Sequence, residues 1–459
     1  MANLLDTIRL GGNSLSAQQI AAQVVGNNIS GASIDGYHRQ DANFLAQPGL
    51  GGVRDVNVVR AANRFLDAQI HGQAGEFAFQ GERAQALAVV MSAVGELEEG
   101  GLSDGFSNFF SSMRNVNVQP ADATTRRDLL AQADVLCSRF NQATDNLESA
   151  QRLADADLLL NLQTVNDALD KVAQLNADVL SARSAGEPAN ALADERDRAV
   201  NQLASLVGAT VSEDKLGMYS VTVGGISVVS STAAYHLQAP VDTTSSMGLH
   251  QVTVEGTTQG NIAPRITSGL IGGKLSARDV DIPAMKDQLD QLAFDFASAV
   301  NLQHQAGYGL DASTGHALFD IPTTAANASR GLAVDAQVAA NPSLIAAATE
   351  PSSVAGDGSN ALAIIELEAS RICTASTETP AAAAARIVSH SGEAVALSEA
   401  KRDTAEIHML QIRELSEQQV GVSLNEQLLQ LSRIENAFQA SSKLVQVAER
   451  MLDALQAMV

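Results

Sequence analysis

The sequence predicts a mainly α-helical, elongated, multi-domain protein. Its N- and C-terminal helices are expected to pair as a coiled coil, beside a long helical-bundle body and a small β-rich insert. Three observations predict this fold: heptad spacing at both chain ends, long helical periodicity between them, and one stretch whose period is two. At 459 residues the chain has room for about three domains. We place the terminal coiled coil at 1–40 with 421–459, the helical body at 41–207 with 266–420, and the β-rich outer domain at 208–265.

The composition limits both the kind of core and the kind of partner. Hydrophobic residues make up 45% of the chain, whereas aromatic residues make up 3% and Trp is absent, so the cores must be built from Leu, Val, Ile and Ala. The net charge of −23 argues against nucleic acid or an anionic membrane surface as a partner, because both attract clustered Lys and Arg. No run of about eighteen apolar residues occurs, and we therefore expect no membrane span.

The first residues do not form a secretory signal. Arg9 is their only cation, and Asp6, Gly11, Gly12 and Ser14 interrupt the apolar residues, so the hydrophobic segment of a signal peptide is missing. We therefore expect either a cytoplasmic protein or one secreted by a route that does not use a cleaved signal.

The N-terminal helix carries a stripe of small and apolar residues at steps of three and four. Its positions are Leu4, Ile8, Gly11, Leu15, Gln18, Ala22, Val25 and Ile29. Gly11 and Gly12 lower the stability of this helix by roughly 1 kcal/mol each relative to Ala. We interpret both as points where another helix approaches closely, and fraying of the helix is the alternative.

A segment rich in turn-forming residues follows this helix. From Asn27 to Arg39, Asn, Ser, Asp and Gly recur, and these residues favour caps and turns because their short side chains bond to nearby backbone groups. The pair Asp35 and Gly36 indicates a turn, after which Tyr37 begins an extended stretch.

The last helix has the clearest periodicity in the chain. Ser423 and Glu426 predict a capping box at its start, since each side chain can accept an amide N–H of the first turn. An apolar stripe, interrupted at Ser441, then runs through Leu431, Ile434, Phe438, Val445, Ala448, Leu452, Leu455 and Val459. From Leu424 onward the helix would be roughly 54 Å long. A helix of that length with one narrow apolar stripe needs a partner, and the N-terminal helix is the candidate.

Helical periodicity dominates the body up to Val207. We expect a turn over 120–122 and a break over 186–188, where Gly and Pro occur. The charged residues 194–198 are interpreted as a solvated helix start with Asp194 as its N-cap. This interpretation is preferred to a catalytic carboxylate pair because the sequence implies no pocket there.

The period changes to two between 208 and 264. Strands are expected at 218–223 and 226–229, with the two glycines between them as a hairpin turn, and a further strand at 251–254. This stretch is the predicted β-rich insert.

Helical periodicity resumes after Pro283. Loops and short turns are expected from 320 to 360, where Ala, Pro, Ser and Gly are frequent. Helices are then expected over 361–371 and 381–419, and Gly421 ends the second of them.

The sequence contains no motif for catalysis, a cofactor or a metal. The eight His never form HxxxH or HExxH spacing, and Cys137 and Cys373 form no CxxC, so we expect two buried thiols and neither a zinc site nor a disulfide. No GxxxxGK[ST] phosphate loop occurs. The glycines between Gly269 and Gly273 are interpreted as bends.

Short motifs at both ends resemble one family. Residues 14–17, Asn27 to Ser30 and Gly36 to Arg39 resemble the N-terminal signature of the flagellar rod, hook and hook-associated axial proteins, with Asn27, Asn28, Ile29, Gly36, Tyr37 and Arg39 as the motif residues. Residues 421–426 and 437–441 are similar to the C-terminal signature of that family. The sequence departs from the family pattern at Gly31, where Asn is frequent, and at 435–436, where paired Gln is usual. These departures concern polar positions.

The resemblance implies a structural role without enzymatic activity. Hook and rod proteins turn to β-structure soon after the Gly-Tyr-x-Arg motif, so the long helical middle favours a hook-associated member at the junction of hook and filament. The resemblance then implies unfolded export through the flagellar type III apparatus with an export chaperone, and a ring of copies between hook protein and hook-associated protein 3. The predicted assembly interface consists of Leu4, Ile8, Leu15, Ile29, Leu424, Leu428, Leu431, Ile434, Phe438, Val445, Leu452 and Leu455.

Three alternatives remain at this point. Another axial role, as hook, distal rod or hook-associated protein 3, is compatible with the same terminal motifs. A wall hydrolase carried on the flagellum and a cytoplasmic coiled-coil tether are the alternatives from other classes, because heptads specify packing and not function.

Overall fold

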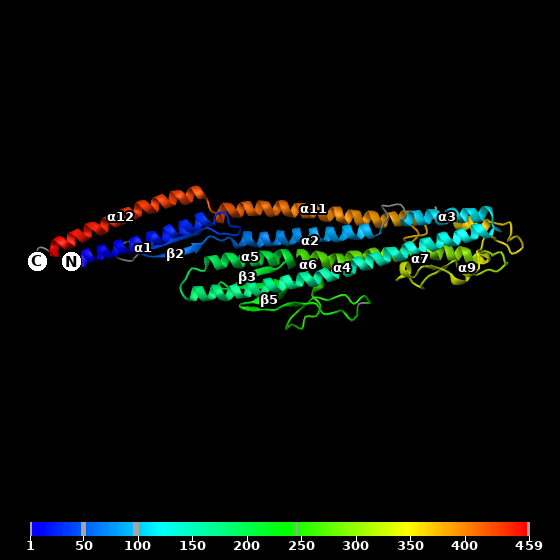
Figure 1. The fold of residues 1–459 in the computed structure, drawn as a ribbon, viewed down its shortest axis with the longest axis horizontal. Coiled ribbons are helices and arrows are strands. Elements are labelled where there is room, and N and C mark those ends of the chain that lie inside the picture. The colour runs from blue at the N-terminus through cyan, green and yellow to red at the C-terminus, as the bar shows by residue number, and fades with distance from the viewer. Residues whose placement is uncertain (1, 47–51, 95–100, 245, 457–459) are drawn as a thin grey trace.

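The chain folds into an elongated, mainly helical molecule with both termini at the same end (Figure 1). This computed structural model describes residues 2–46, 52–94, 101–244 and 246–456. The predicted class, mainly α with a small β-rich insert, is confirmed. The α-helices are α1 (Ala2–Gly31), α2 (Arg64–Val94), α3 (Leu102–Val118), α4 (Ala123–Ser184), α5 (Asn190–Val207), α6 (Gly269–Ser276), α7 (Ile282–Ala306), α8 (Ala328–Gly331), α9 (Ala336–Ala340), α10 (Ser359–Glu366), α11 (Pro380–Val420) and α12 (Leu424–Gln456).

The strands pair only with antiparallel neighbours. A four-stranded sheet in the order β3-β4-β5-β6 forms most of the insert, and its central hairpin turns at Gly224 and Gly225, as predicted. The strands are β1 (Gln40–Ala46), β2 (Val53–Arg60), β3 (Thr210–Glu213), β4 (Tyr219–Val223), β5 (Ile226–Ser230), β6 (Ala233–Ala234), β7 (Leu237–Gln238), β8 (Thr253–Val254), β9 (Phe319–Asp320) and β10 (Ala333–Val334). Short 3₁₀ turns η1 (Ala263–Arg265) and η3 (Pro342–Leu344) and a π-helical turn η2 (Ala277–Asp281) complete the described elements.

Local sequence signals explain several helix ends. Asp122 caps α4, its carboxylate accepting from the Thr125 N–H at 3.1 Å, and Thr379 caps α11 in front of Pro380. Gly208 ends α5 in the left-handed conformation that glycine adopts without steric cost. The predicted turn at 120–122 and break at 186–188 both lie where the structure separates helices.

The hairpin β1–β2 was not predicted. Only an extended stretch was expected after Tyr37, whereas residues 40–46 and 53–60 form two paired strands that lie along α1. The exposed side chains of both strands explain the omission, because neither strand shows a fully buried face.

Two hydrophobic cores lie along α4. The first half of α4 packs with α3, α7 and the start of α11 around a cluster of phenylalanine rings. The ring of Phe296 is fully buried there, with centroids of four other phenylalanines between 4.9 and 6.1 Å away. The second half of α4 packs with α5, α6 and the sheet of the insert.

The interpretation of residues 269–273 as bends is wrong, because they belong to helix α6. The glycines from Gly269 to Gly273 were interpreted as bends, but they form the first turns of a helix that packs on α2. A Cβ on Gly273 would collide with the backbone carbonyl of Phe79, so glycine is required for this close approach. Helical structure therefore resumes at Gly269, before the predicted start after Pro283.

The interpretation of residues 194–198 as a solvated helix start capped by Asp194 is also wrong. Helix α5 begins at Asn190 after Ala189, so Asp194 is not the N-cap. The side chains of Asp194 and Arg196 are buried, and the segment is therefore not a solvated helix start. Asp194 pairs with the distant His38 and Arg60, and Arg196 donates to Asn176 and to the carbonyl of Gly217.

The segment after α7 consists mainly of loops, as predicted, and His304 holds it to that helix. The Nδ1 of His304 lies 2.7 Å from the carbonyl of His316, while its Nε2 accepts the amide N–H of Ala346 at 3.0 Å. These partners require a neutral ring with the proton on Nδ1. Burial lowers the pKa of His304 to about 4.

Truncating Phe296 tests the phenylalanine core. We expect Phe296→Ala to lower the free energy of unfolding by about 4 kcal/mol, because it leaves a cavity among packed rings. Leu302→Ala on the same helix is the control, since Leu302 is 75% exposed, and should change that free energy by about 0.5 kcal/mol or less. Urea denaturation measures both, and equal effects of the two changes would contradict this view of the core.

Acid should destabilise the protein through His304. The pKa of His304 is about 4 in the folded protein and about 6.5 in the unfolded chain. The neutral ring therefore makes its full contribution to the free energy of unfolding above pH 6.5 and loses it as the pH falls toward 4. The loss amounts to about 3 kcal/mol. The difference in unfolding free energy between the parent and His304→Gln should narrow by that amount between pH 7 and pH 4. A difference that stays constant with pH would exclude this role.

Candidate assembly interface

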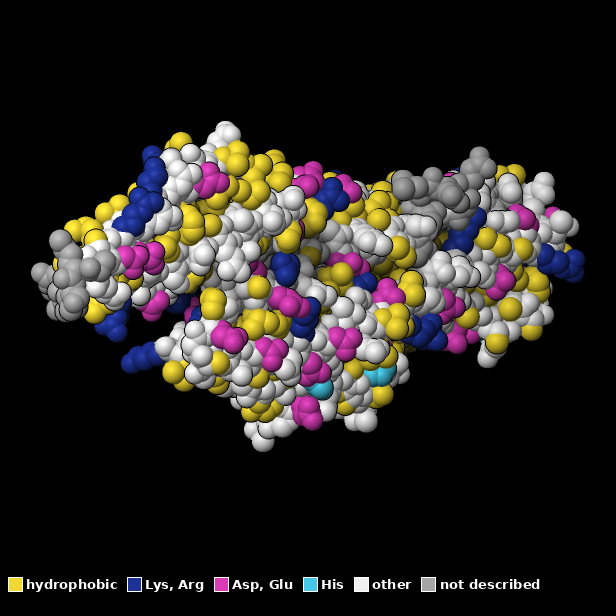
Figure 2. Space-filling model, turned by 60° about the vertical axis from the view of Figure 1, so that its left-hand side comes forward, with side chains coloured by type: hydrophobic (Ala, Val, Ile, Leu, Met, Phe, Trp, Pro, Cys, Tyr) yellow, Lys and Arg dark blue, Asp and Glu magenta, His cyan; other side chains and the backbone are white. Residues whose placement is uncertain are grey.

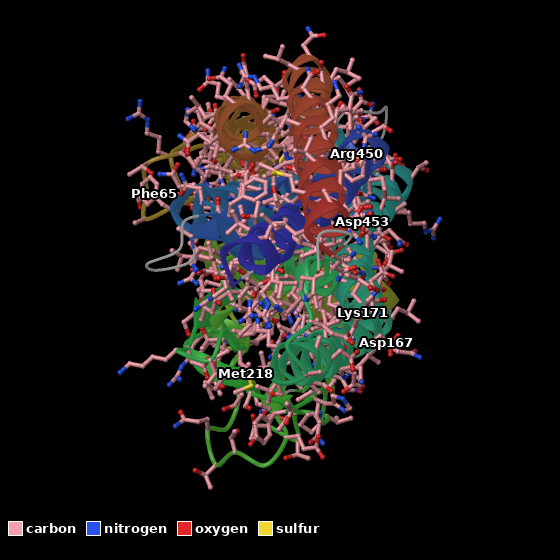
Figure 3. The ribbon with its side chains drawn as sticks, turned by 90° about the vertical axis from the view of Figure 1, so that its left-hand side faces the viewer. Phe65, Asp167, Lys171, Met218, Arg450 and Asp453 are labelled. Atoms are coloured by element: carbon pink, nitrogen blue, oxygen red, sulfur yellow. The ribbon has the colours of Figure 1, made fainter. Side chains whose placement is uncertain are left out.

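The two terminal helices lie side by side, as the heptad stripes predicted. Helix α12 runs antiparallel to α1, and Figure 3 views the pair end-on. Ala21, Val25 and Ile434 form the small buried cluster between them. The hydroxyls of Ser14 and Ser441 lie 3.0 Å apart, so the polar position in the C-terminal stripe meets a polar partner.

The two adjacent glycines of α1 differ in their surroundings. A Cβ on Gly11 would overlap with Val445, which confirms that the second helix approaches closely at this position. Gly12 has nothing within 4 Å of where a Cβ would lie. The prediction that another helix of this chain approaches closely at Gly12 is therefore wrong.

The side chain of Asn28 connects four segments of the terminal part. Its Nδ2 donates to Oε1 of Gln427 on α12 at 2.9 Å and to the carbonyl of Gln40 at 2.8 Å. Its Oδ1 accepts from the Tyr37 hydroxyl and from the Gln40 N–H, both at 2.9 Å. Asn28 is 1% exposed, and all the hydrogen-bonding capacity of its amide is used. This motif residue therefore fixes the turn after α1 against the start of α12.

The other motif residues surround Asn28. Burial and the charge of Asp194 raise the pKa of Tyr37 to about 12, so its hydroxyl stays protonated and keeps donating to Asn28. The backbone N–H of Arg39 donates to the carbonyl of Val420 at 2.9 Å, which ties the motif to the end of α11. Gly36 adopts the left-handed conformation of a turn, whereas Asn27 is exposed.

Of the predicted interface residues, eight lie wholly or partly inside the chain. Ile434 is buried, and the side chains that are half-buried are Leu4, Ile8, Leu15, Ile29, Leu431, Val445 and Leu452. The remaining four are exposed: Leu424, Leu428, Phe438 and Leu455. The Oγ of Ser423 accepts from the Glu426 N–H at 3.5 Å, which is the forward half of the predicted capping box.

A second apolar face of α12 was missed in the sequence. Leu429, Leu444, Val447 and Met451 are each between 45% and 56% exposed, and Leu444, at the edge of this face, also borders Gly11 of α1. Their steps of three and four residues after Leu444 were the available signal. Hydrophobic side chains are frequent on the surface over the terminal end of the molecule (Figure 2).

A cluster of charged side chains lies where the terminal part meets the body. Arg60, at the end of β2, donates through Nε to Asp194 at 2.6 Å and through Nη2 to Asp197. The Nδ1 of His38 lies 2.9 Å from Asp194, and the Tyr219 hydroxyl of the insert donates to Asp197 at 2.7 Å. Burial alone would lower the pKa of Arg60, but the two carboxylates outweigh it and raise that pKa. We call these five residues the joint cluster.

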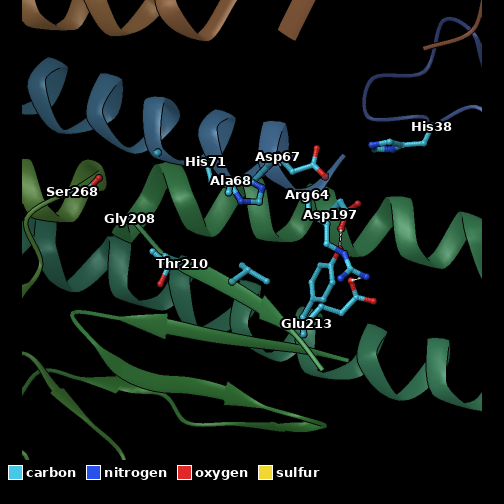
Figure 4. Close-up of a pocket in the computed structure, with 15 residues that line it drawn as sticks. His38, Arg64, Asp67, Ala68, His71, Asp197, Gly208, Thr210, Glu213 and Ser268 are labelled. Carbon is cyan, nitrogen blue, oxygen red and sulfur yellow. Dashed lines mark hydrogen bonds and ion pairs between the residues drawn. The ribbon is translucent and has the colours of Figure 1, made fainter. Parts of the chain in front are cut away.

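A cavity of about 330 Å³ opens beside the joint cluster, between α2, α5 and β3 (Figure 4). Asp67 and His71 line it from α2. Burial raises the pKa of Asp67, with the charge of Asp197 adding to this, and burial lowers the pKa of His71. Both shifts favour neutral side chains in the cavity.

The described residues contain no group of side chains that could hold a metal ion, and none of the described helices has the length and hydrophobicity to span a membrane. Cys137 and Cys373 are both buried and unbonded. Burial raises the pKa of each thiol to about 12.

Comparison with known proteins decides the family. Residues 87–319, just over half of the chain, match the family model of the flagellar hook-associated protein FlgK helical domain. The chain belongs to the FlgK family. The part matched contains α3 to α7 and the β-rich insert, which the terminal motifs alone did not cover.

Relatives of this FlgK family member include two hook-associated proteins. Flagellar hook-associated protein 1 of Salmonella typhimurium is 28% identical over 324 residues, which cover 67% of this chain and 58% of the relative. The chain thus spans less than two thirds of that relative. Flagellar hook-associated protein 1 of Bacillus subtilis is 25% identical over 498 residues, covering 98% of this chain and 96% of the relative.

A solved FlgK structure shares the fold. The flagellar hook junction protein FlgK from Burkholderia pseudomallei superimposes with a TM-score of 0.66 over 76% of this chain and 99% of that one, at 19% identity. The likeness supports the architecture of a long helical body with a small β-rich part.

The structure also explains one departure from the family pattern. A Cβ on Gly31 would lie 2.6 Å from the ring of Tyr37, so the packing of this ring requires glycine where Asn is frequent in relatives. Glu435 and Asn436, the other departures, are exposed on α12 and touch no part of the Asn28 network.

Removing the Asn28 amide tests the connection between the two ends. Asn28→Ala leaves the partners of four hydrogen bonds unpaired in a buried place, and we expect a loss of about 2 kcal/mol in the stability of the α1–α12 pair. Asn27→Ala is the matched control, because Asn27 is the exposed neighbour in the same motif. Amide hydrogen exchange in 2–31 and 424–456 measures the difference. Equal protection in both variants would refute the role of Asn28.

Proposed function

We propose that this protein is a structural component of the bacterial flagellum that forms the junction between hook and filament and is needed for filament assembly. A ring of copies would form this junction. The observation that carries the proposal is the pairing of the two chain ends, which leaves large apolar side chains on the outside of α12. The near full-length alignment with hook-associated protein 1 of Bacillus subtilis supports the same role.

The exposed apolar side chains supply the driving force for assembly. Burying one large apolar side chain is worth about 1.5–3 kcal/mol. The terminal pair leaves eight such residues exposed on α12: Leu424, Leu428, Leu429, Phe438, Leu444, Val447, Met451 and Leu455. Exposed apolar faces of this kind mark interaction sites. In the ring, neighbouring terminal helices would cover them in an inner layer, with the body outside that layer and the insert outermost.

The partners follow from this position. The ring would contact hook protein on one side and hook-associated protein 3 on the other. The chain would reach the cell exterior unfolded, through the flagellar export apparatus and with an export chaperone that covers its apolar residues before export. No nucleic acid is expected as a partner, since the net charge is −23.

The role is structural and not enzymatic. The charged residues of the joint cluster pair with one another across segments, and their geometry leaves no nucleophile beside a base. The same geometry gives no support to a wall hydrolase. Immunogold labelling of intact flagella tests the position directly: label is expected at the hook–filament junction, whereas label along the hook or rod would favour another axial role.

Polar substitutions on the exposed face of α12 test the role in assembly. Leu444→Gln, Val447→Gln and Met451→Gln together keep helix propensity but remove apolar area that a neighbour would cover. Cells that make only this variant should export it and secrete unassembled filament subunits, as should cells that make the chain without residues 425–459. Electron microscopy and the culture supernatant measure filaments and free subunits.

A matched triple variant on another exposed face is the control. Asn425→Gln, Ser432→Gln and Glu435→Gln change the same number of exposed α12 positions without removing apolar side chains. This variant should give normal filaments. Normal filaments with the apolar triple variant, or filament loss with both variants, would contradict the proposed interface.

A further inference from the structure

Among the described residues, the terminal part (α1, β1, β2 and α12) and the body (α2 to α11) share no hydrophobic core. Of the three clusters of buried apolar side chains among the described residues, two lie entirely within the body. The third belongs to α1, β1 and α12. Apolar packing therefore does not fix how the terminal pair is oriented on the body, and polar contacts must do so.

The chain crosses between the two parts at two places, and both crossings are thin. The first lies between β2 and α2, at Ala61 to Asn63, and the second between α11 and α12, around Gly421. The segments at these two crossings contact one another through single hydrogen bonds. One example is the exposed bond from the Asn63 side-chain amide to Oε1 of Gln419, at 2.7 Å. Single exposed hydrogen bonds resist rotation weakly, because water replaces them at little cost.

The joint cluster is a polar contact between the parts that is shielded from water. The side chains of Arg60, Asp194 and Asp197 are 12%, 4% and 14% exposed, so their pairing is shielded from water. A guanidinium bonded to two carboxylates is also directional, since its donors lie in a fixed plane. Tyr219 holds Asp197 from the insert side, and the ring of Tyr219 lies under Arg196, whose Cζ is 3.6 Å from the ring centroid.

We propose that Arg60, Asp194 and Asp197 act as positioning residues that set the angle between the terminal helix pair and the body. Arg60 belongs to the terminal hairpin, and the two carboxylates belong to one face of α5, three residues apart. Their pairing holds β2 at one position along α5. The adjacent cavity of about 330 Å³ lies between α2, α5 and β3 and supplies no packing at this level, so loss of the pairing frees the terminal part to change its orientation.

The inference does not depend on the proposed flagellar role, because it concerns contacts within one chain. Its consequence for that role is that the joint cluster presents the exposed face of α12 at a defined angle. A failure of the test below would leave the proposed junction role untouched.

The test measures distances between spin labels on the two parts of the purified full-length chain. One label is placed at Gln411→Cys on α11 and the other at Asn436→Cys on α12, both of which are exposed. Cys137 and Cys373 are 2% and 0% exposed and stay unlabelled. The parent should give one narrow distance distribution, and Arg60→Ala should widen it about two-fold by releasing the orientation.

Three further variants make the result decisive. Asp194→Asn should widen the distribution as Arg60→Ala does, and Arg60→Lys should restore part of the narrow distribution because it keeps a cation at the cluster. Arg64→Ala is the matched control: Arg64 pairs with Glu213 at 2.5 Å entirely within the body, and its loss should leave the distribution unchanged. The melting temperature of the body should be the same in all variants.

Three outcomes of the distance measurement would overturn the proposal. They are a distribution in Arg60→Ala that matches the parent, a parent distribution that is already as wide as that of Arg60→Ala, and equal widening by Arg64→Ala. A widened distribution that comes with a lower melting temperature of the body would show a folding defect in place of a positioning role, and would overturn it as well.

Discussion

The meeting of the two chain ends is the constraint on which the rest of the molecule depends. Asn28 and Gln427 are 399 residues apart in sequence, and their buried amides bond to one another. Because α1 and α12 must lie together, the chain has to leave the terminal part and return to it. Helices α2 and α11 make these two passages side by side, and the elements between them in the sequence connect their far ends, with α5 and α6 lying back along α2 (Figure 1). An elongated shape with both termini at one end follows directly from this requirement.

Much of the fold could be predicted because its signals are local. A few neighbouring residues are enough to predict the heptad helices, the helix breaks at 120–122 and 186–188, and the hairpin turn at Gly224 and Gly225. The hairpin β1–β2 was not predicted because neither strand has a fully buried side chain and β1 shows no alternation of exposure. Helix α6 escaped because its glycines disfavour a helix locally and become favourable only where α2 leaves no space for side chains.

The sequence predicted those residues of the candidate interface that recur at heptad spacing. The stripe residues of α1 and α12 were found, whereas their distribution between an inner and an outer face was not, since that depends on how two helices wind around each other. The partners of Asp194 could not be found, because Arg60 is 134 residues away and nothing near Asp194 indicates it. Charged residues near a helix start resemble a cap until the tertiary structure shows what they bind.

Helix α4 is a single rod of 62 residues, about 93 Å at 1.5 Å per residue. One half is embedded among the phenylalanine rings, and the other half supports the β-sheet of the insert. The two cores therefore cannot shift relative to one another without bending or twisting this rod. A mechanical load on the insert would be transmitted along α4 to the opposite end of the body. The body would therefore rotate under torque as one rigid unit.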